Sequence, residues 1–289
     1  MTDDWKKRGA ALFDMDGTLF PWDTQYVFSC FVVRRHPWRR LLIFLFLACI
    51  PLYILRIWDE NRMKRAYLMY LWGLPAETVR EYGRKFAEMA QEWIYPELKE
   101  RLAGYRKKGY LCLMVSASPS FYVKPLGELL GFDEVLGTDV LLEERMPAMP
   151  ELPNGNNKGA VKVERLRERN VLPEHGVLEN AVAYSDSAAD LPMLLSCRRR
   201  VLVNPSPALK DGSLHVFDTS KFTVNGETVT TAPIDLTFYD YSTGTPVAVY
   251  QGDTEEAITD GYFSESTLRS APYFSLRIDG ITEDADPVA

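Results

Sequence analysis

Three short apolar runs in the first two thirds of the chain have the length and composition of buried strands. They cover residues 10–13, 110–115 and 181–184, and almost no polar position interrupts them. Segments with helical spacing of apolar and charged residues separate the runs. Strands that alternate with helices in this way are typical of a mainly parallel sheet covered by helices. The pattern therefore predicts an α/β fold for this part of the chain.

Polar residues stand directly after the first two runs. The carboxyl ends of parallel strands open into a common crevice, so residues in these loops are expected to meet there. The first loop contributes Asp14, Asp16 and Thr18, and the second begins with Ser116. Asp14 and Asp16 stand two positions apart and point the same way in extended chain, so one can attack a substrate while the other transfers a proton. Taken alone, Asp16 and the glycine after it read equally well as a turn.

Two further segments add candidate charges. Asp186 and Asp190 follow the third run, and their spacing places both carboxylates on one face of the next turn, where they suit a hard cation. A helix cap is the simpler role for either residue alone. Lys158 opens a charged helical stretch, residues 159–169, in which a lone lysine is usually a solvated surface charge. Ser118 reads as the N-cap of the helix after the second run.

Read in chain order, these residues resemble the signature of the haloacid dehalogenase (HAD) superfamily, specifically its phosphoserine-phosphatase-like branch. The resemblance implies a HAD-type phosphatase that hydrolyses phosphoric monoesters. Asp14 would be the nucleophile that forms an aspartyl-phosphate, and Asp16 would protonate the leaving alkoxide and then activate water. Thr18 and Ser116 would bind phosphoryl oxygens, and Lys158 would neutralise their charge. Phosphoryl transfer needs such placement and charge neutralisation more than unusual side chains.

The resemblance also implies a magnesium cofactor. Mg²⁺ would be held by Asp14, by the backbone carbonyl of Asp16 and by Asp186. Asp190 would order either Lys158 or the surroundings of the metal. The chain holds 3 histidines and none lies near a motif, so histidine catalysis is not expected.

A long interval separates Thr18 from Ser116. In the family that the chain resembles, an insertion at this position is a helical cap over the active site. The expected first domain is therefore residues 1–210, a Rossmann-like parallel sheet with an inserted helical cap. Its expected parts are a core of residues 8–24 and 105–210 and a membrane-associated cap of residues 25–104.

The cap contains an unusually apolar run, the 15 uncharged residues 41–55. As a helix it would be about 22 Å long, short of the roughly 30 Å hydrocarbon core of a bilayer, and Pro51 would kink it. A single crossing would put a membrane between Asp14 and Ser116, which one shared active site forbids. The run is therefore expected to lie in the membrane interface, to enter and return, or to pack in the core of the cap.

Basic and aromatic residues surround this run. The basic ones are Arg34, Arg35, Arg39, Arg40, Arg56, Arg62, Lys64 and Arg65, and the aromatic ones are Trp38, Trp58, Tyr67 and Trp72. Such flanks suit an anionic membrane surface. With the motifs, they make residues 8–208 resemble the phosphatidylglycerophosphatase C family of membrane-associated HAD phosphatases. This resemblance implies phospholipid metabolism, a substrate such as phosphatidylglycerophosphate, and the cytoplasmic face of the inner membrane.

Beyond residue 210 the chain changes character. Residues 1–210 hold 30 Lys and Arg against 26 Asp and Glu, whereas residues 211–289 hold 3 against 14. Short strands are predicted in this acidic tail at residues 222–230, 234–241, 246–251 and 273–278, the first with an Asn-Gly hairpin signal. The tail is therefore expected to form a small all-β, sandwich-like domain of unknown function, either a fused module or a piece foreign to the phosphatase.

Composition limits the remaining alternatives. The 4 cysteines show no paired spacing, which favours a reducing cytoplasm. Residues 1–8 are polar and charged, so no N-terminal signal is expected, and no basic stretch interleaved with aromatics points to nucleic acid. Two other functions stay open: a soluble cytoplasmic phosphatase of the phosphoserine type, and a non-catalytic binding module carried by the tail. The first would need charged cap groups, which residues 41–55 do not offer, and the intact Asp14 and Asp16 argue against the second.

Overall fold

The protein is built around a parallel five-stranded sheet. The computed structural model describes residues 5–204 and, beyond them, residues 221–224, 227–230, 234–240, 246–250 and 274–280. The parallel strands stand in the order β3-β2-β1-β4-β5. Their bounds are β1 (Ala10–Phe13), β2 (Leu111–Pro119), β3 (Glu134–Thr138), β4 (Leu178–Ser185) and β5 (Cys197–Val203). This arrangement confirms the expected α/β fold with a Rossmann-like sheet.

The sheet separates two apolar clusters. Every residue of β1 is fully buried, and alternate side chains of a strand point to opposite faces. Phe13 therefore packs on one face, where its ring stacks on Tyr184 with centroids 4.5 Å apart, while Leu12 packs on the other face with Leu166. The first face is covered by α7 (Pro96–Lys107) and α8 (Ser120–Leu130), and the second by α1 (Trp5–Arg8), α9 (Ala160–Glu168) and α10 (Leu191–Leu195). Two single turns, η3 (Gln91–Trp93) and η4 (Ala188–Asp190), complete this part of the described chain.

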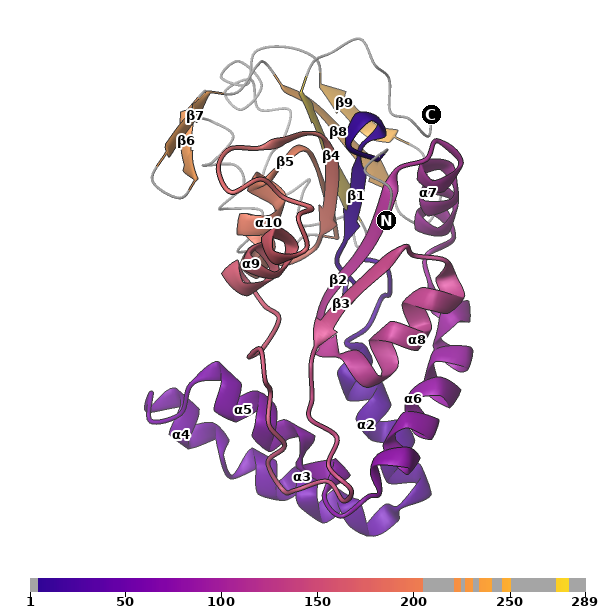
Figure 1. Ribbon diagram of the computed structural model, residues 1–289, viewed down its shortest axis with the longest axis vertical. Helices are drawn as coiled ribbons and strands as arrows, with labels where there is room; N and C mark the ends of the chain where they lie inside the picture. Colours follow the sequence, from indigo (N-terminus) through magenta and orange to yellow (C-terminus); the bar gives the residue numbers. More distant parts are fainter. Residues whose placement is uncertain are drawn as a thin grey trace.

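A helical cap is inserted between β1 and α7 and forms the lower lobe in Figure 1. The sequence predicts such an insertion, but the cap ends before α7, which packs on the sheet, and not at the expected residue 104. Its elements are α2 (Thr24–Arg35), η1 (Pro37–Arg39), α3 (Arg40–Leu47), α4 (Ile50–Ile54), α5 (Glu60–Tyr67), η2 (Leu68–Leu71) and α6 (Ala76–Ala90). Helix α6 lies tightly against α8, because a Cβ at Gly83 would come within 2.2 Å of the Phe121 carbonyl oxygen. The absence of a side chain there therefore sets how closely the cap approaches the core.

A second segment of chain also runs along the cap. Residues 139–159, between β3 and α9, descend past the cap helices and return to the core (Figure 1). Backbone hydrogen bonds fix this segment, with Gly73 N donating to Met146 O over 2.8 Å and Ala76 N donating to Glu144 O over 3.2 Å. The cap is thus connected to the core in two ways. One is the insertion between β1 and α7, which the sequence indicates, and the other is the segment of residues 139–159.

The apolar run of residues 41–55 lies mostly on the surface of the cap. It forms α3 and α4, which are interrupted just before Pro51 as its ring requires. Leu42 is the one buried residue of α3, and α4 has none. In the described chain, Pro37–Ile54 is long and apolar enough to cross a membrane by length and composition alone, and only 11% of it is buried. The alternative that this run packs in the cap core is therefore wrong.

The charged flank of the run is only partly exposed. Arg39 is buried and donates to the carbonyl oxygens of Tyr70 and Trp72, each over 2.7 Å. Arg65 bonds two carbonyl groups of the segment 139–159. The basic residues that remain exposed around the run are Arg34, Arg35, Arg40, Arg56 and Arg62.

Strands are present at the expected places beyond residue 220. They are β6 (Lys221–Val224), β7 (Glu227–Thr230), β8 (Ile234–Asp240), β9 (Pro246–Tyr250) and β10 (Phe274–Gly280). β6 pairs antiparallel with β7, and β10 pairs antiparallel with both β5 and β8. Most of the expected acidic domain, including the join near residue 210, lies outside the described residues, so its sandwich and its boundary stay predictions.

Candidate active site

The loop after β1 brings Asp14 against the loop after β4. Asp14 is 6% exposed, and the Thr18 hydroxyl lies 3.3 Å from its Oδ2 and 3.2 Å from Oδ1 of Asp186. The same hydroxyl accepts the backbone N–H of Asp186 over 2.9 Å. Gly17 makes this approach possible, since its φ is 77° and a Cβ there would stand 2.4 Å from the Asp186 carboxylate. The structure thus gathers Asp14, Thr18 and Asp186 as the sequence predicts.

The cation beside Asp14 is Lys162 rather than the expected Lys158. Lys162 is 1% exposed, and its Nζ donates to Asp14 Oδ1 over 2.6 Å and to Asp190 Oδ2 over 2.7 Å. Ser185 Oγ also donates to Asp190 Oδ2, over 2.8 Å. Asp190 therefore orders a lysine, as predicted, but that lysine stands one helical turn later in the chain.

Helix phase explains the correction at Lys158. Gly159 has a φ of 61°, and α9 begins only after it, so Lys158 is left outside the helix and reaches Glu60 of the cap over 3.1 Å. Within α9, Lys162 and Leu166 lie four residues apart and share the face that is buried against the sheet. A lysine on the apolar face of an amphipathic helix was the sequence signal that could have identified Lys162.

Asp16 points away from Asp14 toward the start of the cap. Its Oδ1 accepts the backbone N–H of Thr24, the first residue of α2, and its Oδ2 accepts the Ser118 hydroxyl, both over 2.6 Å. Burial raises the pKa of Asp16, although these hydrogen bonds oppose the shift. A carboxyl group with a raised pKa is suited to donating and accepting a proton in turn.

Ser118 has a different role from the expected helix cap. Helix α8 begins at Ser120 with Pro119 as its N-cap residue, which leaves the Ser118 hydroxyl to bond Asp16. Its backbone N–H donates to Ser116 Oγ over 2.9 Å. Ser116 is fully buried at the carboxyl-terminal part of β2, the neighbour of β1, so it lies on the same side of the sheet as the other motif residues.

Asn157 fixes the loop that leads into α9. Its side-chain amide donates to the carbonyl oxygens of Ser116, over 2.9 Å, and Leu136, over 3.0 Å. Its backbone N–H donates to Thr138 Oγ1 over 3.0 Å. Asn157 has no distinctive sequence signal, because it stands in a loop rich in glycine and asparagine, where such residues are common.

The electrostatics of the site call for another cation. Burial, together with the charges of Asp190 and Asp186, raises the pKa of Asp14 despite the opposing charge of Lys162. Burial also raises the pKa of Asp186 to about 6. The charges of Asp14 and Asp190 outweigh burial at Lys162 and raise its pKa. Three carboxylates thus face one ammonium group.

The oxygen-rich donor set fits a hard divalent cation. No group of three His, Cys, Asp or Glu side chains within the described ranges forms a complete metal cluster. Mg²⁺ does not require one, because it commonly binds one or two carboxylates and completes its shell with water and other oxygen atoms. Asp14 and Asp186 would supply the carboxylates, and the Asp16 carbonyl is the expected third ligand.

Comparison with known proteins places the chain among enzymes. A family model of haloacid dehalogenase-like hydrolases matches residues 11–195. The inhibition of morphological differentiation protein of Streptomyces azureus is 32% identical over 216 residues, which cover 72% of this chain and 76% of that protein. The probable phosphatase Rv3661 of Mycobacterium tuberculosis is 25% identical over 217 residues, covering 71% and 72% of the two chains.

Solved structures share the fold. A protein of unknown function from Bordetella pertussis aligns with a TM-score of 0.59 and 23% identity over 72% of this chain and 95% of that one. A probable phosphoserine phosphatase from Vibrio cholerae aligns with a TM-score of 0.51 and 17% identity over 72% and 59% of the two chains. The fold is thus similar to that of a probable phosphoserine phosphatase, and the chain belongs to the haloacid dehalogenase-like hydrolase family, as the sequence predicts.

Proposed function

We propose that the protein is a Mg²⁺-dependent phosphatase that acts through an aspartyl-phosphate on the phosphomonoester of a membrane phospholipid. The observation that supports this chemistry is the contact of the buried Asp14 with Lys162. Asp16, the second aspartate of the same loop, faces the cap. Lys162 holds one oxygen of Asp14 at 2.6 Å, which fixes the direction of the other oxygen. Such placement is the main requirement of phosphoryl transfer.

The residues divide the reaction into two steps. In the first, an oxygen of Asp14 bonds to phosphorus while the bond from phosphorus to the alcohol oxygen breaks, and Asp16 gives its proton to that oxygen. In the second, Asp16 takes a proton from water, whose oxygen displaces Asp14 and releases inorganic phosphate. Lys162, Thr18 and Ser116 would bind phosphoryl oxygens in both steps. Bound Mg²⁺ would supply positive charge against the transferring group.

The lipid substrate is inferred from the surface of the cap. Leu41 is 62% exposed, Phe44 66%, Ile54 71% and Leu55 68%, so α3, α4 and the residue after α4 present several large apolar side chains to the outside. Large exposed apolar patches mark contacts with membranes or proteins. The exposed arginines on either side favour an anionic lipid surface, because each attracts acidic headgroups. The resemblance to the phosphatidylglycerophosphatase C family supports the further proposal that this membrane is the inner membrane, bound at its cytoplasmic face.

A phosphate-release assay tests the proposal. The wild-type protein should release phosphate from phosphatidylglycerophosphate or phosphatidate in detergent micelles when Mg²⁺ is present. Asp14→Asn should remove turnover and keep the thermal midpoint, whereas Glu164→Gln, an exposed carboxylate on the outer face of α9, should retain full activity.

The outcomes separate the alternatives. Turnover of phosphoserine without turnover of either lipid would support the soluble phosphoserine-type enzyme instead. Full activity of Asp14→Asn would contradict the aspartyl-phosphate mechanism, and complete inactivity of the wild type on every phosphomonoester would favour a binding module.

A further inference from the structure

A groove lies along helix α2, between this helix, the carboxyl-terminal end of α6 and η3. Its volume is about 810 Å³, within the range of about 300–1,000 Å³ that is typical of pockets for small organic ligands. Asp14, Asp16 and Lys162 are not among its lining residues. The groove is therefore not part of the site of phosphoryl transfer.

Most of the lining comes from one stripe of α2. Its members stand at positions i, i+3, i+4, i+7, i+8 and i+11, which share one face of a helix. They are Asp23, Tyr26, Val27, Cys30, Phe31 and Arg34. Tyr26 is 62% exposed, and Val27 and Cys30 are half-buried, so neighbouring elements of the described chain leave this stretch open. At 1.5 Å per residue the stripe is about 16 Å long, which gives the groove the form of a channel for an elongated ligand.

Apolar and aromatic side chains also form the other walls. Trp22 and Trp93 meet edge to face with ring centroids 5.4 Å apart, and Met89 of α6 is 40% exposed. Between its ends the groove thus offers few hydrogen-bond partners. An extended peptide would lose the water around its backbone groups without replacement, whereas a hydrocarbon chain gains free energy by leaving water.

The two ends of the groove carry opposite charges. Asp23 stands at the amino end of α2, where it accepts the backbone N–H of Tyr26 over 2.9 Å. At the carboxyl end, Arg35 donates to the Phe31 carbonyl oxygen over 3.0 Å and lies 3.5 Å from the centre of the Phe31 ring. Arg34 is exposed and pairs with no carboxylate in the described chain. An anion is therefore favoured at Arg34 and repelled at the other end.

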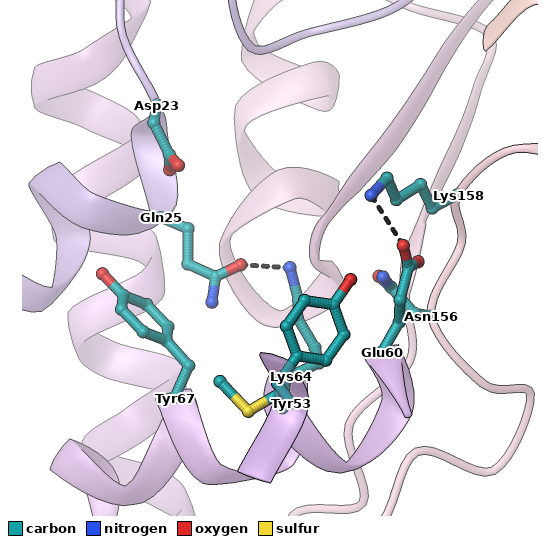
Figure 2. Close-up of a pocket in the computed structure, with 9 residues that line it drawn as sticks. Asp23, Gln25, Tyr53, Glu60, Lys64, Tyr67, Asn156 and Lys158 are labelled. Atoms are coloured by element: carbon teal, nitrogen blue, oxygen red, sulfur yellow. Dashed lines mark hydrogen bonds and ion pairs between the residues drawn. The ribbon is translucent and has the colours of Figure 1, made fainter. Parts of the chain in front are cut away.

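The groove is also separate from the pocket between α2, α5 and Lys158. Figure 2 shows that pocket, in which Lys64 donates to the side-chain oxygen of Gln25. Asp23 is the one residue that lines both cavities. A ligand of the groove would thus not occupy the space in front of Lys64.

We propose that the groove binds a long-chain fatty acid as its carboxylate, with the chain along the stripe of α2 and the carboxylate at Arg34. Opposite charges at the two ends fix this orientation, and the apolar channel between them selects the chain. The site goes beyond the proposed phosphatase function, because its ligand carries no phosphomonoester.

Calorimetric titration of the full-length protein with soluble amphiphiles, below their micelle concentrations, tests the proposal. One dodecanoate should bind per chain, and affinity should rise about tenfold for each two carbons from octanoate to dodecanoate, because each buried CH₂ group adds a similar free energy. Dodecanoate should bind about fivefold or more tightly than dodecanol or dodecyltrimethylammonium, which have the same chain without the negative charge. Equal affinity for the three head groups, or no binding of dodecanoate, would overturn the proposal.

Variants assign the two parts of the ligand to the two parts of the groove. Arg34→Met should bring the affinities for dodecanoate and dodecanol to within about twofold of each other, while Arg40→Met, an exposed arginine outside the lining, should keep the preference. Met89→Asp should weaken both ligands about tenfold or more, because it places a charge beside the chain. Leu129→Asp on α8 is its matched control and should bind as the wild type does. An unchanged preference in Arg34→Met, or unchanged binding in Met89→Asp, would contradict the assignment.

The apolar surface of α3 is the competing place for a hydrocarbon chain. The double variant Leu45→Asp with Leu47→Asp should bind dodecanoate as tightly as the wild type, since neither residue lines the groove. Loss of binding in this variant, with full binding in Met89→Asp, would place the chain on α3 and overturn the proposal. Binding of dodecanoate by a protein that hydrolyses no phosphomonoester would contradict the proposed function alone.

Discussion

Buried charge dominates the site at the scale of single residues. Lys162 bridges Asp14 and Asp190 at 2.6 and 2.7 Å, and all three side chains are almost fully buried. Removal of one member of such a group leaves its partners charged and unpaired, which costs far more than the loss of an exposed ion pair. The pair of Lys158 and Glu60 is of the exposed kind, with side chains 43% and 52% exposed.

The two lysines should therefore respond differently to substitution. Lys162→Met should lower kcat/KM by about 10²- to 10³-fold, the usual loss when one charge-stabilising group is removed from an active site. Lys158→Met should change kcat/KM several-fold at most, because its charge is already neutralised at the edge of the cap. Steady-state kinetics of both variants on one substrate measure the two losses of kcat/KM. A larger loss in Lys158→Met than in Lys162→Met would support the original expectation that Lys158 neutralises the phosphoryl charge.

Ser118 provides a test of the role of Asp16. Ser118→Ala removes a hydrogen bond that lowers the pKa of Asp16, so that pKa should rise further. We expect kcat to fall about tenfold, the effect of one hydrogen bond to a charged group, and the limb of the pH profile that reports Asp16 to move to higher pH. Ser196→Ala, which removes a hydroxyl bonded to the Pro192 carbonyl, is the control and should leave the limb in place. An unmoved limb in Ser118→Ala would argue against proton transfer by Asp16.

At the scale of elements, α3 and α4 are apolar helices with little to pack against. A helix that is apolar on all sides is stable in a protein core or in lipid, yet the cap buries one residue of α3 and none of α4. The break before Pro51 keeps both helices short, which suits an interfacial position better than a crossing. These properties support the proposed contact of α3 and α4 with a membrane surface.

Replacement of exposed leucines should detach the protein from membranes without unfolding it. Leu45 is 48% exposed and Leu47 46%, so Leu45→Asp with Leu47→Asp should shift the thermal midpoint little and abolish sedimentation with anionic vesicles. Leu129→Asp on α8, at 48% exposure, is the matched control and should still bind. Added salt should weaken only the contribution of the arginines to vesicle binding, since electrostatic attraction to the lipid surface decays within about 8 Å at physiological ionic strength. A wild type that ignores vesicles would contradict the interfacial proposal.

At the scale of the whole molecule, we expect binding of the proposed metal to be coupled to folding stability. The pKa of Asp186 is about 6 in the folded protein against an ordinary 3.8, so this carboxyl binds its proton more tightly when folded. The metal-free protein should therefore be less stable above about pH 6 and regain stability as the pH falls from 6 toward 4, by about 2 kcal/mol. Mg²⁺ would pair with the ionised, partly buried carboxylate, so it should raise the thermal midpoint strongly at pH 7.5 and weakly at pH 5.

Thermal unfolding with Mg²⁺ or EDTA at the two pH values measures this coupling. Asp186→Asn should flatten the pH dependence and weaken the response to Mg²⁺, because the titrating ligand is gone. Equal stabilisation by Mg²⁺ at both pH values, or none at either, would contradict the metal assignment. Reversible loss of activity in EDTA should accompany the fall in thermal midpoint.

The sequence alone determined three strands of the parallel sheet and the polar residues that follow them. Apolar runs define β1, β2 and β4 locally, and Asp14, Ser116 and Asp186 follow them directly, so parallel pairing is enough to bring these residues to one edge. The strands and the residues at their ends follow from short-range patterning and from the geometry of parallel sheets. The cap was predicted from the resemblance to the haloacid dehalogenase superfamily, in which a long interval between the first two motifs is a helical cap.

Only the tertiary structure decided which side chains of the remaining elements face the site. The choice of Lys162 over Lys158 depends on where α9 begins, and a shift of one turn exchanges a buried position for an exposed one. The exposure of α3 and α4, and the direction in which Lys64 points, depend on how the cap helices pack against one another and on residues 139–159. Helix phase and interelement packing involve contacts between residues distant in the chain, which a local pattern of apolar and polar positions does not encode.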